Sequence, residues 1–150
     1  MRDGIDRESI ELTHPVRIHG QGDVKFIKSD TSDVILDVNA KIYNDSKWPN
    51  KQSLSIQNVK FLGSEEPNEL GTGIRLDYGT SVKINKSHFA HFDNVINANH
   101  SSFSISNSIL SNNRTISYHR SHLYAGTSQE DTVQFVHVNV LNTREAITDL

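Results

Sequence analysis

Cysteine is absent from this chain of 150 residues, and proline and tryptophan are scarce. The lack of cysteine excludes disulfides and thiolate metal sites. Positive charge is not in excess, because the formal net charge is −3, so no overall basic field attracts nucleic acid or an anionic membrane. No apolar run is long enough to span a bilayer. We therefore expect neither a nucleic-acid partner nor membrane insertion, and no motif marks a cofactor.

What the chain does contain is an imperfect repeat. In each copy two apolar residues flank one polar residue, and a third apolar residue follows five positions after the second. The four copies are Leu54-Ser55-Ile56 with Phe61, Val82-Lys83-Ile84 with Phe89, Phe103-Ser104-Ile105 with Leu110, and Val133-Gln134-Phe135 with Val140. They recur after 28, 21 and 30 residues, which is a period typical of solenoids.

The apolar residues alternate with a period of two, which favours β-strands over helices. Two to three short strands in about 21 residues, joined by tight polar turns, predict one coil of a parallel β-helix. About five to six such coils fit the chain, at roughly 4.8 Å of rise per coil. Ile74, Val95 and Ile116 are candidates for one stacked position, with Ile96 as the alternative to Val95.

Asparagine and serine are concentrated in residues 85–113. Asparagine tolerates the left-handed backbone of tight bends. Asn58 and Asn107 each lie two residues after the second apolar position of a repeat, where Lys86 and His137 stand in the other copies. We therefore expect Asn58 and Asn107 to form bends, and Lys86 and His137 to interrupt any column of stacked asparagines.

We predict a single β-helix domain over residues 1–150. The alternative that these residues are a fragment of a longer solenoid stays open. Two polar segments, 44–53 and 63–73, interrupt the repeat. Loops that interrupt a regular scaffold often shape a binding surface.

Residues 10–22 (Ile-Glu-Leu-Thr-His-Pro-Val-Arg-Ile-His-Gly-Gln-Gly) resemble the opening coil of right-handed parallel β-helix proteins of the pectate-lyase-like superfamily. Residues 55–61, 73–76 and 104–110 are similar to its internal coils. The resemblance covers most of residues 10–142. It implies an all-β fold, a right-handed single-stranded parallel β-helix.

Within that superfamily, the short coils rich in Asn and Ser are most similar to bacteriophage tailspike and tail-fibre domains. The resemblance implies a homotrimer in the virion, or outside the cell, that binds a bacterial surface glycan, with cleavage left open. The alternatives are a stand-alone polysaccharide lyase or glycoside hydrolase, and a purely structural spacer of a fibre or adhesin.

Cleavage of a glycosidic bond by hydrolysis needs two carboxylates, about 5–5.5 Å apart for retention or 6.5–9.5 Å for inversion. Asp77 follows the strand pattern at Ile74–Leu76, and Asp93 precedes the position of Val95. We predict that they lie at similar places one coil apart, with Arg75 holding Asp77 ionised. The alternative is that both are solvated acids that stabilise turns.

Candidate glycan contacts come from the insertions and from the last part of the repeat. They are Trp48, Glu65, Glu66, Tyr118 and Arg120. An indole stacks on a sugar face or anchors another subunit, and a guanidinium pairs with an acidic sugar. The alternatives are that Trp48 folds back as a lid and that the acids keep a loop soluble.

Eight histidines include two His-x-x-His pairs, His88/His91 and His119/His122. In a strand, residues i and i+3 point to opposite faces, so such a pair does not form a bidentate metal site there. Spacing marks no third ligand. We therefore predict no metal.

Overall fold

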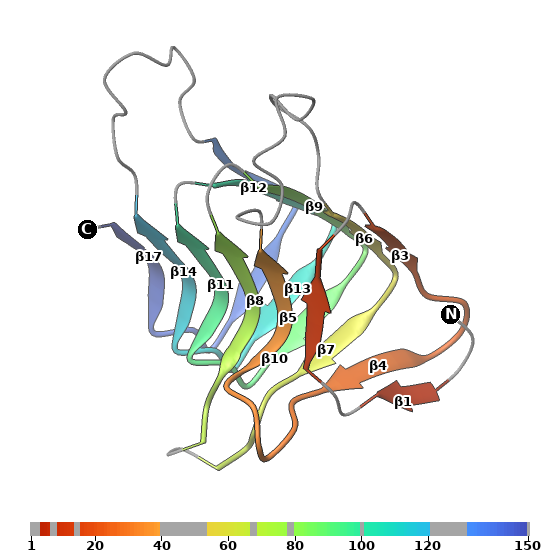
Figure 1. The fold of residues 1–150 in the computed structure, drawn as a ribbon. Coiled ribbons are helices and arrows are strands. Elements are labelled where there is room, and N and C mark those ends of the chain that lie inside the picture. Colours follow the sequence, from red (N-terminus) through yellow and green to blue (C-terminus); the bar gives the residue numbers. More distant parts are fainter. Residues whose placement is uncertain are drawn as a thin grey trace.

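The computed structural model describes residues 4–6, 9–13, 16–39, 54–66, 69–77, 80–99, 101–120 and 132–149. Within these ranges the regular secondary structure is all β, and it forms three sheets (Figure 1). Sheet A contains β1 (Gly4–Asp6), β4 (Val24–Ile27), β7 (Lys60–Leu62), β10 (His88–Ala90), β13 (Ile109–Ser111) and β16 (Asn139–Leu141). Sheet B contains β2 (Ile10–Leu12), β5 (Val34–Asn39), β8 (Thr72–Asp77), β11 (Asn94–Asn99), β14 (Thr115–Arg120) and β17 (Glu145–Asp149). Sheet C contains β3 (Val16–His19), β6 (Leu54–Gln57), β9 (Ser81–Asn85), β12 (Ser102–Ser106) and β15 (Val133–Val136).

The chain visits the three sheets in turn, so that every third strand returns to the same sheet. All the strand pairs are parallel; the pair β8 and β11 is one example. Figure 1 shows β5, β8, β11, β14 and β17 side by side, in their order along the chain. This cyclic order is consistent with a parallel β-helix. The predictions of an all-β fold and of parallel strands are confirmed.

The strand register aligns all four copies of the apolar repeat. The first positions pair as Leu54–Val82–Phe103–Val133, the second as Ile56–Ile84–Ile105–Phe135, and the third as Phe61–Phe89–Leu110–Val140. The predicted stacked position in sheet B was wrong. Ile74 pairs with Ile96, the alternative to Val95, because Asn94 pairs with Thr72. Ile96 in turn pairs with Ser117 and not with Ile116.

The repeat fills the interior with apolar side chains. Phe61 lies between Phe26 and Phe89, with ring centroids 5.2 and 4.5 Å away and with nearly parallel ring planes. All three rings are fully buried. At the C-terminal end of the same column Val140 is 46% exposed, because no further strand of the described residues covers it.

Two corners of the coil are formed by residues with left-handed backbone. The corner before sheet A has Asn58, Lys86, Asn107 and His137, and the corner before sheet B has His91, Asn112 and Asn142, all with φ between 48° and 63°. At the first corner the backbone N–H groups of Asn58, Lys86 and Asn107 donate to a carbonyl one coil further along, as in Asn58 to Asn85 (3.1 Å). The predicted bends at Asn58 and Asn107 are confirmed, and Lys86 and His137 form the same left-handed bend in the other coils.

Buried hydroxyl groups connect neighbouring coils just after the first corner. The N–H of Val59 donates to Ser87 Oγ (3.4 Å), and the N–H of Ser87 donates to Ser108 Oγ (3.1 Å). The two hydroxyls in turn donate to the carbonyls of Asn85 and Ser106. Serine therefore satisfies buried backbone donors that the turn leaves out of the sheet.

The interruption at 63–73 lies between β7 and β8, and Thr72 and Gly73 belong to β8. Gly63 is required at its start, since a Cβ there would lie 1.8 Å from the carbonyl oxygen of His91. The other interruption, 44–53, lies outside the described residues.

Candidate functional site

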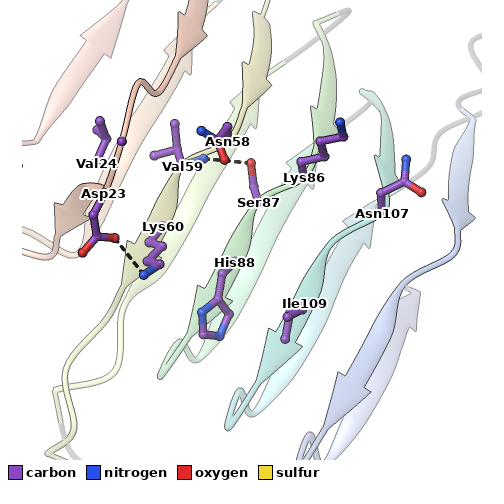
Figure 2. A pocket seen from close by; sticks show the side chains of 11 residues that line it. Asp23, Val24, Asn58, Val59, Lys60, Lys86, Ser87, His88, Asn107 and Ile109 are labelled. Atoms are coloured by element: carbon purple, nitrogen blue, oxygen red, sulfur yellow. Dashed lines mark hydrogen bonds and ion pairs between the residues drawn. The ribbon is translucent and has the colours of Figure 1, made fainter. Parts of the chain in front are cut away.

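A groove of about 240 Å³ runs along the outside of the first corner. We call it the corner groove. Its lining is Gly22, Asp23, Val24, Asn58, Val59, Lys60, Lys86, Ser87, His88, Asn107 and Ile109. These residues come from the turn before β4 and from the starts of β7, β10 and β13, so the groove crosses successive coils (Figure 2).

Two parallel rows of side chains form the groove, and the repeat itself places them. Asn58, Lys86 and Asn107 follow one another at the left-handed corner, and all three are exposed. Two residues later in each coil, Lys60, His88 and Ile109 form the second row, paired in register. Figure 2 shows both rows. Within a row, the coil spacing of about 4.8 Å separates each residue from the next.

Asp23 closes one end of the groove with two ion pairs. Its carboxylate lies 2.7 Å from Lys60 Nζ and 3.0 Å from Lys25 Nζ. The hydrogen bond from Lys60, and then that from Lys25, lowers the pKa of Asp23. A single carboxylate therefore serves two ammonium groups.

His88 lies at the centre of the second row and is half-buried. Its Nε2 is 2.8 Å from Ser111 Oγ on the next strand. Burial lowers the pKa of His88, and the charges of Lys60 and His91 lower it further. The imidazole therefore stays neutral to lower pH than an ordinary histidine, with no acid among the causes of the shift.

Lys86 is the cation of the first row. Its side chain is exposed, and no acidic residue within the described parts of the chain forms an ion pair with it. Its φ of 49° is uncommon for lysine, because a side chain with a Cβ is strained in the left-handed region. The groove thus offers ammonium, imidazole and amide groups over an apolar floor of Val24 and Val59, which suits binding rather than acid–base cleavage.

The outer face of sheet B carries a second polar cluster. Arg75 Nη1 lies 3.1 Å from Asp37 Oδ2, across the pair β5–β8. Burial raises the pKa of Asp37, Arg75 lowers it, and the charges of Asp77 and Glu11 raise it. Asp37 and Asp77 lie on neighbouring strands, two residues apart in register, so their Cα atoms are separated by roughly 8 Å.

The structure does not bring Asp77 and Asp93 together. Asp77 ends β8 and pairs with Asn99, which lies at the far end of β11 from Asp93. The two acids are therefore separated by roughly the length of a strand, 15–20 Å. The predicted juxtaposition was wrong, because Asp93 belongs to the turn before β11 and its level is that of Gly71.

The expected partner of Asp77 was wrong as well. Arg75 donates to Asp37 and not to Asp77, although the alternation of the strand puts Arg75 and Asp77 on one face. Asp93 forms its own ion pair, with Arg114 at 3.1 Å, in a largely exposed position.

The predicted glycan contacts lie apart from the corner groove or outside the described residues. Glu65 and Glu66 are exposed in the turn after β7 and do not line the groove. Tyr118 and Arg120 belong to β14, where the register pairs them with Asn97 and Asn99. The structure describes the backbone of Tyr118 and Arg120 but not their side chains, and Trp48 lies outside the described residues.

Of the two His-x-x-His pairs, His88 is in β10 and His91 forms the following corner. Within the described ranges no three His, Asp or Glu side chains gather closely enough to hold a metal ion. No helix among those residues is long and apolar enough to cross a bilayer.

Sequence reasoning missed Asp23, Lys60 and Asp37 as site residues. A signal was available for Lys86, because a lysine replaces asparagine in the corner column. No comparable signal marks Asp23, which reaches Lys60 only through the pairing of β4 with β7.

Comparisons with protein-family models, with curated proteins and with solved structures give no match to this chain.

Proposed function

We propose that this chain is a right-handed parallel β-helix module of about five to six coils that binds a surface polysaccharide in the corner groove. The observation that carries the proposal is the groove itself, in which polar side chains recur on successive coils above apolar positions. An extended polymer laid along the groove meets amide, ammonium and imidazole groups repeatedly. Such a ligand has a repeating structure, as the groove has.

The composition of the groove favours sugar as the ligand. Sugar hydroxyls accept and donate hydrogen bonds, and Asn58, Lys86, His88 and Asn107 supply groups of both kinds. The exposed side chain of Ile109 adds apolar contact, as is usual in small-molecule sites. By contrast, the chain's net negative charge does not favour nucleic acid.

The biological setting that we propose is a bacteriophage tail protein, assembled as a homotrimer on the virion and directed at a bacterial surface glycan. It rests on the resemblance of the coils to tailspike domains, and it predicts a trimer in solution. Sedimentation equilibrium tests this setting, and a clean monomer across the accessible concentration range would count against it.

The binding test is a panel of bacterial capsular polysaccharides, lipopolysaccharide O-chains and teichoic acids, measured with the wild-type chain and one double variant. Asn58→Gly with Asn107→Gly removes two groove amides while keeping residues that accept φ of 56° and 48°. The matched control is Asn112→Gly, which makes the same change at the other corner, at φ 55°.

We expect the double variant to lose binding to the glycan that the wild type selects, and the control to retain it. If no glycan in the panel binds the wild type, the result counts against the proposed function and favours the alternative of a structural spacer. If the control loses binding as well, the corner groove is not the site.

Hydrolysis is a second candidate function, and the pair Asp37 and Asp77 is the observation that favours it. The Cα spacing of roughly 8 Å is compatible with the carboxylate separation of about 6.5–9.5 Å in inverting glycosidases. The raised pKa of Asp37 is what a general acid requires. Reducing-end release that persists in both Asp37→Asn and Asp77→Asn would refute this assignment.

A further inference from the structure

We propose that the corner groove selects polysaccharides that carry carboxylate or phosphate groups, and that Asp23 is a built-in counter-ion that such a group displaces. This inference rests on the proposed function and names the class of glycan. It also assigns to Asp23 a role in regulating access to the ammonium groups of the groove.

The local charge of the corner groove is opposite in sign to the net charge of the chain. The chain as a whole has a net charge of −3, but the groove is lined by Lys60 and Lys86 against one acid, Asp23. Lys25 adds a third ammonium at 3.0 Å from Asp23. The sign of the charge is therefore inverted at the groove, and an anion is attracted there from solution.

Asp23 lies in an exposed turn at one end of the corner groove. It directly follows Gly22, whose φ is 82°, in the turn between β3 and β4. Its side chain is 52% exposed, yet it lies 2.7 Å from Lys60 Nζ. An exposed ion pair of this kind contributes little net free energy, so an incoming carboxylate or phosphate competes with it effectively.

The ligand anion takes a place between Lys60 and His88, which are neighbours in register. Lys86 lies at the corner before His88, and its side chain is directed away from both (Figure 2). An anion between Lys60 and His88 accepts charge-assisted hydrogen bonds from both side chains. Such bonds favour the charged imidazole, so ligand binding raises the pKa of His88.

The groups that act on His88 are Lys60 on β7, His91 at the following corner and Ser111 on β13. Lys86 and Asp23 are the other charged groups that line the groove. Burial, Lys60 and His91 all oppose protonation of His88, so a negative charge placed beside the imidazole raises its pKa against them.

The test compares polymers with and without charge. Dissociation constants are measured for alginate, for carboxyl-reduced alginate and for a poly(glycerol phosphate) teichoic acid, at two salt concentrations. The first and third polymers distinguish carboxylate from phosphate, and the reduced polymer keeps the sugar backbone while removing the charge. We expect at least one anionic polymer to bind more tightly than the neutral one, with an affinity that falls as salt increases.

The decisive variant is Asp23→Asn, which we expect to tighten anionic binding about two- to fivefold by releasing Lys60 and Lys25. Its matched control is Asp30→Asn, which removes another exposed acid and changes the net charge equally. Lys60→Gln is expected to weaken binding by a similar factor, and Lys83→Gln, on the outer face of sheet C, to leave it unchanged.

The nuclear magnetic resonance titration of His88 localises the ligand. We expect its pKa to rise when the anionic polymer is present and to stay constant with the neutral polymer. Asp23→Asn that leaves affinity unchanged or weakens it would refute the counter-ion role. Equal binding of neutral and anionic polymers would refute the charge selectivity while leaving the proposed function intact, whereas no binding of any polymer on either panel would refute both.

Discussion

Arg75 donates a 3.1 Å hydrogen bond to Oδ2 of Asp37, while Oδ1 of the same carboxylate is buried without a hydrogen-bond partner among the described residues. The pair thus satisfies only half of the carboxylate. Burial outweighs the nearby guanidinium, and the pKa of Asp37 is raised rather than lowered. This is the opposite of the usual effect of an ion pair, and it has a consequence for stability.

The raised pKa makes the contribution of Asp37 to stability depend on pH. In the unfolded chain the carboxyl group of Asp37 loses its proton near pH 3.8, whereas in the native chain it keeps the proton to higher pH. The stabilisation of the native state by the neutral acid is therefore fully present at low pH. It is lost as pH rises through the folded-state pKa. We expect the free energy of unfolding of Asp37→Asn, relative to wild type, to increase as pH rises above 3.8.

Urea denaturation between pH 3 and 7 measures this difference. The control is Asp30→Asn, at an exposed position. A difference curve that falls with pH, or one of the same shape and size in the control, would contradict the assignment to burial.

Asn113 is a buried amide that serves two backbone groups. Its Oδ1 accepts from the N–H of Phe92 and its Nδ2 donates to the carbonyl of Phe89, both at 3.1 Å. Asn113→Ala leaves both groups buried and unsatisfied, so we expect a loss of about 2–4 kcal/mol in the free energy of unfolding. Asn139→Ala is the control at an exposed position, with an expected change within about 0.5 kcal/mol.

Leu110 and Leu141 allow the same substitution to be compared inside and outside the stack. Leu110 is fully buried in the column that contains Phe61 and Phe89, and Leu141 is 54% exposed. We expect Leu110→Ala to cost about 2–5 kcal/mol of unfolding free energy. Leu141→Ala should cost less than about 0.5 kcal/mol in the same denaturant titration. Equal losses would show that the C-terminal end of the stack is covered in solution.

Lys86 combines backbone strain with a place in the corner groove. Asparagine tolerates a φ of 49° better than lysine does, so we expect Lys86→Asn to raise the free energy of unfolding by about 0.5–1 kcal/mol. The same variant loses an ammonium group and should bind anionic glycan less tightly. Thermal denaturation and a binding titration on one preparation measure both effects.

Lys83→Asn is the matched change in an extended strand, where asparagine is disfavoured, and it should give no gain in stability. A Lys86→Asn variant that is both less stable and equally good at binding would overturn the expected trade-off between stability and function.

Much of the scaffold was predictable because the apolar period is written directly in the chain. The alignment of Val82 with Phe103 follows from the local alternation of apolar and polar residues, which is the pattern of a strand with one buried face. The left-handed corner at Lys86 was also predictable, because its distance from the preceding apolar residue equals that of Asn58. Both features depend only on residues that are close together in the sequence, so the sequence pattern is enough to predict them.

The exact register in sheet B was not predictable at the same level. Val95 and Ile96 are both apolar and both buried, so the pattern alone cannot choose which of them pairs with Ile74. The predicted juxtaposition of Asp77 and Asp93 failed for the same reason, because it depended on the register between β8 and β11. The position of a turn residue depends on how many residues the preceding corner uses, which composition does not determine.

By itself the sequence determined the parallel β architecture, its apolar columns and the bends that separate its strands, because each depends on the spacing of nearby residues. Only the tertiary structure decided which outward side chains meet. Asp23 reaches Lys60, and Arg75 reaches Asp37, across strands that are 35 or more residues apart in the chain. The physical reason is that a coil brings its neighbours to about 4.8 Å whatever the length of the turns between them, and the turns vary.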